Sequence, residues 1–514
     1  MAGHPRFLVF CVDQMQAACM SCVGHPDVRT PNLDRLASEG TLFSRTYCEN
    51  PVCTPSRVSI MTGLSSRQHG VYTNGSMIPS DVPTVPSVLR EAGYRTKSVG
   101  KLHLQPWSHE SSPESHGNIP EGYFGFESCD FVAGHVHYVR GDYREWLIRE
   151  HPEWAKDLVK RRHEDIWSYY EDEDAHVPSS RLCRTWRMEV PPELHYNNWI
   201  ADRSIDYIKG LDDDEEFFLW SSFPDPHHPF AACKPYSEMY DPDEIELPAS
   251  WAEPTEDMPD IPRWQHGIDL DDWDERGLRE MLAQTYGMIS HVDDNVGRVM
   301  EALRETGRDE NTVVVFMADH GDYLGGHHLI CKGMLPYEEL VRVPYLWRAP
   351  GGAVGQEISE PCSLLDFAPT VLNYAGVPLE NLMPAPSRGT GPWHYAQEVI
   401  EPWFHGVDLR ETLETGSEPD RPPLIIAKEE NRFPEHLGME RAVRGRTLVT
   451  ERYKLAIFAR PGNNALYDLQ EDPHELHNLW NEPAARDVKL QLLETCARRS
   501  AWTEYPGRGR IGGA

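Results

Sequence analysis

Two apolar, β-branched segments lie far apart in the sequence, and each ends at an aspartate. Residues 6–12 (Arg-Phe-Leu-Val-Phe-Cys-Val) lead into Asp13, and residues 312–318 (Thr-Val-Val-Val-Phe-Met-Ala) lead into Asp319. Apolar runs of this length are typical of strands that are buried on both faces of a parallel sheet. Because ligands in open α/β sheets bind beyond the carboxyl ends of such strands, we expect the two aspartates to share one functional edge.

The sequence between and around these runs alternates helix patterns with strand patterns. This alternation favours an α/β fold with a mostly parallel sheet sandwiched by helices. The expected helices lie near residues 31–39, 56–64, 84–93, 193–210 and 278–306, and the expected strands near 6–12, 41–47, 95–99, 216–222 and 312–318.

The pattern divides the chain into two parts. Residues 1–380 form the predicted main α/β domain, with an insertion at about 104–190 that has no repeated strand signal and in which His135-Val-His137 is expected on a surface loop. Residues 381–514 form a predicted linker, running to about residue 435, and a smaller C-terminal antiparallel α+β subdomain. Alternating residues predict its strands at 441–450 and 453–458, followed by a helix near 484–498.

The residues that follow the two strands offer a set of metal ligands. They supply two carboxylates, an amide oxygen and one imidazole nitrogen, from Asp13, Gln14, Asp319 and His320. Oxygen-rich sets of this kind favour a hard divalent cation over a thiolate-bound zinc. We expect one such ion, with Ca²⁺ favoured and Mg²⁺ or Mn²⁺ as alternatives.

A short motif around Cys53 suggests the chemistry. Residues 50–57 read Asn-Pro-Val-Cys-Thr-Pro-Ser-Arg, and this sequence resembles the maturation motif of type I sulfatases, a family of the alkaline-phosphatase-like superfamily. The resemblance implies that a maturase oxidises Cys53 to formylglycine, an aldehyde whose hydrate is the nucleophile. A geminal diol can expel sulfate after the attack, whereas a thiol would leave a thiosulfate with no route of breakdown. The alternative reading is a buried cysteine in a Pro-rich turn.

Further blocks resemble the same family in the same order, at residues 31–36, 59–63, 100–103, 226–230 and 337–344. The resemblance implies a hydrolase that uses formylglycine and a divalent metal to cleave a sulfate monoester to alcohol and sulfate, with residues 1–380 as its catalytic domain. Its substrate would be a small-molecule or saccharide sulfate ester.

The resemblance also assigns residues to roles. The metal ligands would be Asp13, Gln14, Cys53, Asp319 and His320. The side chains around the sulfate group would be Arg57, Lys101, His103, His227 and Lys332. Asn74 is a further predicted pocket contact, and His227 is preferred to its neighbour His228.

The chemistry of these side chains agrees with the implied roles. Fixed cations and a metal stabilise the charge that develops on the leaving oxygen, and histidines can serve as general acid and general base. Lys101 and His103 are two residues apart, so on an extended segment they would point the same way.

Two departures from the common sulfatase pattern define the main alternative. Many sulfatases have an aspartate at the position of Gln14 and an asparagine at that of His320. The Asp-Gln and Asp-His pairing resembles relatives that hydrolyse phosphonate monoesters and phosphodiesters. Those relatives tend to lack the Lys-x-His element, which is present here as Lys101 and His103, so the sulfatase reading is favoured. A third reading is a non-catalytic protein that binds anions or sugars.

Composition excludes some partners and suggests a compartment. The formal net charge of −33 argues against nucleic acid, and the chain has no apolar run long enough to span a membrane. The first strand begins within a few residues of Met1, which leaves no room for a secretory signal, and the eleven cysteines are odd in number and irregularly spaced. We therefore expect a cytoplasmic protein with reduced thiols, and homo-oligomer formation is left open.

Overall fold

A mixed eight-stranded sheet forms the centre of the molecule. The computed structural model describes residues 4–78, 82–107, 109–135, 139–158, 185–252, 268–269, 274–379, 404–430, 443–459, 462 and 464–502. The strand order is β12-β2-β11-β8-β1-β6-β4-β5. In that order the strands are Gln356–Ile358, Thr41–Phe43, Tyr345–Arg348, Thr312–Ala318, Arg6–Val12, Phe217–Phe223, Arg95–Gly100 and Ser128–Phe131.

The two apolar runs of the sequence are neighbouring strands in the middle of this sheet. Strand β1 pairs in parallel with β8 on one side and with β6 on the other. Because Val12 pairs with Ala318, the residues that follow, Asp13 and Asp319, leave the sheet side by side. Strands β4 and β5 continue the parallel part, while β11 runs antiparallel to β8. The predicted α/β fold with a mostly parallel sheet is confirmed.

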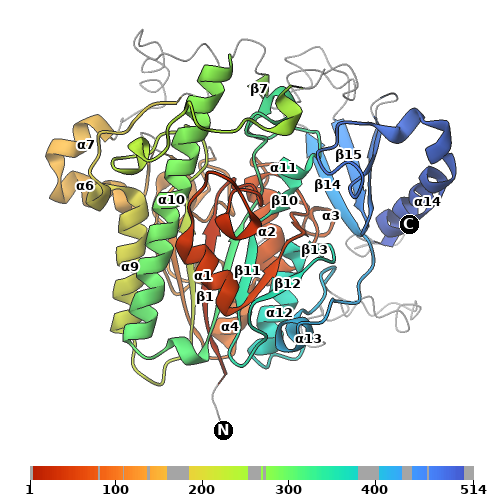
Figure 1. Ribbon diagram of the computed structural model, residues 1–514. Helices are drawn as coiled ribbons and strands as arrows, with labels where there is room; N and C mark the ends of the chain where they lie inside the picture. The colour runs from red at the N-terminus through yellow and green to blue at the C-terminus, as the bar shows by residue number, and fades with distance from the viewer. Residues whose placement is uncertain are drawn as a thin grey trace.

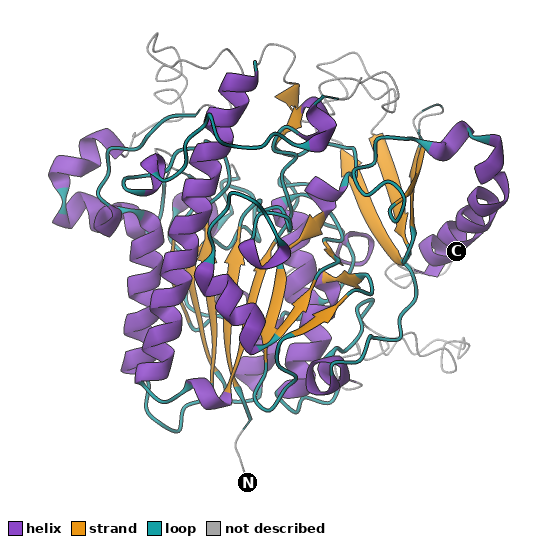
Figure 2. Cartoon of the chain, in the orientation of Figure 1, coloured by secondary structure: helices purple, strands orange, loops and turns teal. Residues whose placement is uncertain are grey.

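Helices cover both faces of the sheet, as Figure 2 shows. On the face turned to the viewer in Figure 1, α1 (Pro31–Glu39) and α9 (Tyr196–Gly210) pack against the long helix α10 (Glu275–Glu305). Asp274 caps the start of α10 by accepting a hydrogen bond from the Gly277 N–H. A second group of helices, whose members contact one another, consists of α2 (Cys53–Thr62), α4 (Val85–Glu91) and α12 (Phe367–Tyr374).

Shorter helices and small sheets complete the main body. The shorter helices are α3 (Ser66–His69), α5 (Pro113–His116), α6 (Asp142–Glu150), α7 (Pro152–Leu158), α11 (Glu338–Val341) and α13 (Arg410–Thr415). The small sheets pair β10 (Arg342–Val343) and β13 (Cys362–Ser363) with β3 (Thr46–Tyr47), and β7 (Ile268–Asp269) with β9 (Leu329–Ile330). Among the described residues, no helix is both long and apolar enough to cross a membrane.

A separate antiparallel sheet follows near the C-terminus, at the right of Figure 1. Its strands are β14 (Leu424–Glu430), β15 (Val443–Val449), β16 (Tyr453–Phe458) and β17 (Ala465–Asp468), and α14 (Arg486–Trp502) packs on it. Leu448, Leu455 and Leu466 form a small apolar core beneath this helix. The predicted C-terminal antiparallel α+β architecture is confirmed.

Three local predictions are wrong. The strand expected at 41–47 is two short strands, β2 and β3, which belong to different sheets. The insertion at 104–190, which shows no repeated strand signal, contributes β5 to the edge of the main sheet. The linker expected up to residue 435 contains α13 and β14. The predicted boundary between the two parts, at residues 380 and 381, lies outside the described residues.

Candidate active site

The ends of β1 and β8 place two buried carboxylates at one point. Asp13 and Asp319 are both fully buried. The Asp13 N–H donates to the Phe223 carbonyl, and the Asp319 N–H donates to the Val12 carbonyl, each at 3.2 Å. The backbone ladder therefore extends one residue past the apolar runs and fixes the direction in which both side chains leave the sheet.

Cys53 reaches the same point as the first residue of helix α2. Its Sγ lies 3.5 Å from Oδ1 of Asp13 and 3.1 Å from Nε2 of His320. Burial raises the pKa of the Cys53 thiol, and the neighbouring Lys332 ammonium opposes that shift. Asn74 holds the start of the helix, because its Oδ1 accepts a hydrogen bond from the Thr54 N–H at 3.0 Å. Asn74 therefore lies next to Cys53, where its side chain is hydrogen-bonded to the backbone of Thr54.

The donor atoms at this point suit a divalent cation. One donor atom from each of Asp13, Cys53, Asp319 and His320 lies within 4.8 Å of the other three, and all four residues are buried. Two buried carboxylates need positive charge close by, and a carboxylate-rich set with one imidazole is a common site for hard metals. The residues therefore fit the predicted metal.

Gln14 lies beside this set in a left-handed backbone conformation (φ 65°). Its Nε2 donates to Oδ2 of Asp322, and its Oε1 accepts a hydrogen bond from Nζ of Lys332 at 2.7 Å. The Gln14 N–H donates to Oδ1 of Asp319 at 3.0 Å. The amide oxygen that was predicted to bind the metal thus lies at the edge of the cluster, in contact with a cation.

Three basic side chains surround the carboxylates. Arg57 is fully buried, and its Nε lies 2.7 Å from Oδ2 of Asp319. Nζ of Lys101 contacts Oδ2 of Asp13, and Nζ of Lys332 lies 3.2 Å from Sγ of Cys53.

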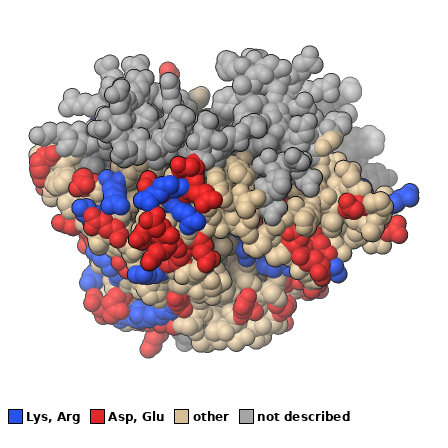
Figure 3. Space-filling model, turned by 45° about the horizontal axis from the view of Figure 1, so that its top comes forward, with Lys and Arg blue, Asp and Glu red and all other residues tan. Residues whose placement is uncertain are grey.

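Burial and charge act in opposite directions on these groups. Burial alone would raise the pKa of Asp319, but the Arg57 guanidinium and other nearby charges hold it below its usual range. Burial lowers the pKa of Lys101 to about 7, although the Asp319 carboxylate opposes this. On the outer face drawn in Figure 3, by contrast, acidic and basic side chains are interspersed. Arg57 and Lys101 are almost completely buried, and the acidic side chains on the surface are screened by salt. The site can therefore hold basic groups although the chain has a net charge of −33.

The histidines of the site stack on other aromatic rings. His227 and His228 stack at 4.0 Å between ring centroids, and His103 stacks on Trp107 at 4.1 Å. Nε2 of His227 lies 3.1 Å from Nζ of Lys332, and Nδ1 of His228 lies 3.1 Å from Nε2 of Gln14, so both histidines of the pair belong to the site.

Two details of this region differ from the sequence-based expectations. His103 has a positive φ of 56°, so the segment from Lys101 to His103 is not extended. His135, expected on a surface loop, is 94 % buried and stacks on His227 at 3.9 Å between ring centroids. His137 lies outside the described residues.

The sequence analysis also missed Asp322. This buried carboxylate accepts hydrogen bonds from the backbone N–H groups of Leu324 and Cys331, at 2.9 Å and 2.6 Å. It also accepts from the side chain of Gln14, so it orients a predicted metal ligand. Its position three residues after Asp319, in the same strand-end loop, is the signal that could have identified it.

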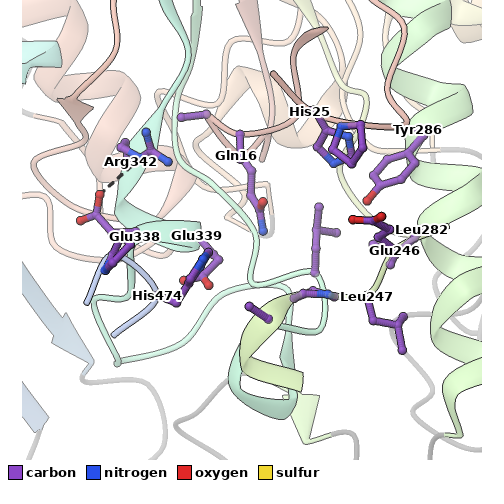
Figure 4. Close-up of a pocket in the computed structure, with 17 residues that line it drawn as sticks. Gln16, His25, Glu246, Leu247, Leu282, Tyr286, Glu338, Glu339, Arg342 and His474 are labelled. Atoms are coloured by element: carbon purple, nitrogen blue, oxygen red, sulfur yellow. Dashed lines mark ion pairs between the residues drawn. The ribbon is translucent and has the colours of Figure 1, made fainter. Parts of the chain in front are cut away.

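A cavity of about 350 Å³ lies next to this loop and is drawn in Figure 4. Gln16 lines it and donates from Nε2 to the Asp322 carbonyl at 2.6 Å. Glu246, Glu338 and Glu339 also line it, and Arg342 pairs with Glu338 at 3.3 Å. The cavity wall contains none of the three basic side chains around Cys53, so the buried cluster, and not this cavity, is the candidate site for an anionic group.

Comparison with known proteins places this arrangement in a family. Residues 5–377 match the sulfatase family, and residues 430–501 match the C-terminal part of N-sulphoglucosamine sulphohydrolase. The chain belongs to the sulfatase family. It is an enzyme that hydrolyses sulfate esters, and its fold is that of the alkaline-phosphatase-like superfamily.

Individual sulfatases and their relatives match over nearly the whole chain. An arylsulfatase from Clostridium perfringens (strain 13 / Type A) is 29 % identical over 97 % of this chain and 96 % of its own length. The multifunctional alkaline phosphatase superfamily protein PehA from Trinickia caryophylli is 27 % identical over 89 % of this chain and 87 % of its own.

Solved structures share the fold of the chain. The crystal structure of a phosphonate monoester hydrolase from Agrobacterium radiobacter superposes with a TM-score of 0.74 at 25 % identity, covering 97 % of this chain and 96 % of that one. A protein solved with D-glucosamine-2-N,6-O-disulfate shares the fold, with a TM-score of 0.70 at 20 % identity over 99 % of this chain and all of that one.

Proposed function

We propose that the protein cleaves sulfate monoesters with a formylglycine that a maturase makes from Cys53. The reaction would also use one divalent cation, for which Ca²⁺ is the favoured candidate. The observation that carries the proposal is the environment of Cys53. Its Sγ lies 3.5 Å from a carboxylate oxygen of Asp13 and 3.2 Å from Nζ of Lys332. A side chain that carries two oxygens at this position would face both a metal-binding set and a cation.

The formylglycine and the cation would supply two kinds of chemistry. A hydrated formylglycine offers two hydroxyl groups on one carbon, one to attack sulfur and one whose deprotonation releases sulfate. The cation, held by Asp13, Asp319, His320, Gln14 and residue 53, would polarise the sulfate oxygens and favour the deprotonated nucleophile.

The protein side chains would bind and orient the ester. In their protonated forms, Lys332 beside Cys53 and Lys101 beside Asp13 would place positive charge close to the oxygens to which negative charge shifts. Arg57 would act mainly by position, because its Nε pairs with Asp319 and its Nη1 donates to the Lys101 carbonyl. His103 and His227 are the candidates for the general acid, which protonates the leaving alcohol, and the general base, which removes a proton from the diol.

The substrate proposal is a sulfated saccharide or a small sulfate ester. It is supported by the N-acetylglucosamine-6-O-sulfatase of Bacteroides thetaiotaomicron, which is 26 % identical over 96 % of this chain. The similarity to an arylsulfatase supports testing aryl sulfates first, because their cleavage can be followed directly.

A second candidate is phosphonate monoester hydrolysis. Two observations favour phosphonate hydrolysis. Gln14 and His320 contribute no negative charge to the metal ligands, and the chain is similar to the Agrobacterium radiobacter hydrolase. The presence of Lys101 and His103, both buried at the site, favours the sulfatase.

The test uses matured, metal-loaded protein with matched 4-nitrophenyl sulfate and 4-nitrophenyl phenylphosphonate. We expect a higher kcat/KM for the sulfate and no turnover of either substrate by Cys53→Ala. A preference for the phosphonate would replace the first candidate by the second. Full activity of Cys53→Ala would refute the proposed nucleophile.

A further inference from the structure

His135 is a buried histidine of the site that none of the sequence motifs includes. It follows β5, in the segment predicted as an insertion, and only 6 % of it is exposed. Its ring stacks on that of His227 with centroids 3.9 Å apart and planes 5° apart. His227 therefore lies between two rings, because His228 stacks on it as well at 4.0 Å.

Both ring nitrogens of His135 are buried and have no hydrogen-bond partner among the described residues. Oδ2 of Asp13 lies 3.8 Å from Nε2 of His135, which is beyond hydrogen-bonding distance. That oxygen is in contact with Nζ of Lys101. Buried polar atoms in proteins are almost always paired, so a ring with two unpaired nitrogens indicates a partner that binds there.

The position of the ring indicates what that partner is. Nε2 of His135 lies 3.8 Å from Oδ2 of Asp13, which contacts Nζ of Lys101. The face of the ring lies on His227, whose Nε2 is 3.1 Å from Nζ of Lys332. His135 is thus next to a partner of each lysine, Asp13 for Lys101 and His227 for Lys332. An uncharged imidazole offers one N–H donor in either tautomer, so at this position it can donate to an oxygen of an anion held by both lysines.

We propose that His135 is a substrate-contacting residue, which donates a hydrogen bond from a ring nitrogen to an oxygen of the bound sulfate ester. This inference rests on the proposed function. It gives the segment after β5 a direct part in binding the anionic group, in addition to any part in shaping the pocket for the alcohol.

The competing explanation is that His135 serves only to hold the ring of His227. Three substitutions separate the two roles. His135→Phe keeps an aromatic ring for stacking and removes both nitrogens. His135→Asn and His135→Gln remove the ring and keep an N–H donor near the Nδ1 and Nε2 positions respectively.

The experiment measures kcat/KM for 4-nitrophenyl sulfate and the inhibition constant of inorganic sulfate, with matured and metal-loaded protein. For His135→Phe we expect a fall in kcat/KM of about 10- to 100-fold and weaker sulfate inhibition, as for the loss of a hydrogen bond to a charged group. At least one of the two amide variants should keep several-fold more activity than His135→Phe. The melting temperature shows whether each variant is folded.

The proposal is overturned if His135→Phe stays within threefold of the wild type, or if neither amide variant exceeds it. It is also overturned if His135→Phe loses the bound metal, because His135 would then be a ligand of the metal and not of the substrate. If the wild type cleaves only the phosphonate, the proposed function fails, and the same variants tested on the phosphonate still decide the role of His135.

Discussion

Replacing Lys332 with methionine should remove one of the charges on which the proposed chemistry depends. Nζ of Lys332 lies 3.2 Å from Sγ of Cys53 and 3.1 Å from Nε2 of His227. A unit charge at about 4 Å interacts with a second unit charge by about 4 kcal/mol at an effective dielectric constant of about 20. Removing a single donor to a developing oxyanion costs about 3–4 kcal/mol, so both routes predict a fall in kcat of about 10²- to 10³-fold.

The assay is steady-state hydrolysis of 4-nitrophenyl sulfate by wild type, Lys332→Met and Lys332→Arg. Methionine keeps most of the length of the side chain, and arginine keeps its charge, so the arginine variant should lie between the other two. The modification of Cys53 is measured in each protein first, because incomplete maturation would also lower kcat. A kcat for Lys332→Met within threefold of the wild type would show that this charge does not act on the reacting group.

Three further predictions follow from the site and its surroundings. Removal of metal by a chelator should abolish activity, and Ca²⁺ should restore it best; full activity of demonstrably metal-free protein would contradict the metal proposal. Arg57→Lys should lower the free energy of unfolding by about 2–4 kcal/mol in urea titrations. Lysine cannot replace the guanidinium contacts with Asp319, Ser222 and the Lys101 carbonyl. An unchanged urea midpoint would show that these contacts do not stabilise the fold. Burial raises the pKa of Glu49 from 4.5 to about 7, so the folded state binds more protons and the contribution of this group to stability, present below pH 4.5, is lost as the pH rises through 7. Relative to Glu49→Gln, the wild type should therefore lose about 3 kcal/mol between pH 4.5 and about pH 8, and a constant difference would contradict the reasoning.

The parts of the fold that the sequence predicted well are those with a strong local pattern. Strands β1 and β8 are apolar throughout because they are covered on both faces, and α10 keeps apolar residues on one side over its whole length. Asp13 and Asp319 could be placed together because strand ends meet at one edge of a parallel sheet, whereas Cys53 was added to them only through the resemblance of its motif.

The parts that could not be predicted depend on distant contacts. Nothing in the residues next to His135 indicates that its ring will be covered by His227, which is 92 positions later. Strand β5 is half-exposed at the edge of the sheet, so its side chains do not show the pattern of a buried strand. The positive φ of His103 reflects its place among Lys101, Trp107 and the rest of the site, and sequence spacing alone cannot reveal such strain.

The proposed mechanism requires that Cys53 becomes an aldehyde. The most direct test is mass spectrometry of the tryptic peptide of residues 46–57, from protein made in its own host or together with a maturase. We expect a mass that matches formylglycine in place of Cys53, and a peptide that reacts with a hydrazide and takes up one carbamidomethyl group from iodoacetamide, at Cys48, and not two. An active protein whose peptide keeps an alkylatable thiol at position 53 would contradict it.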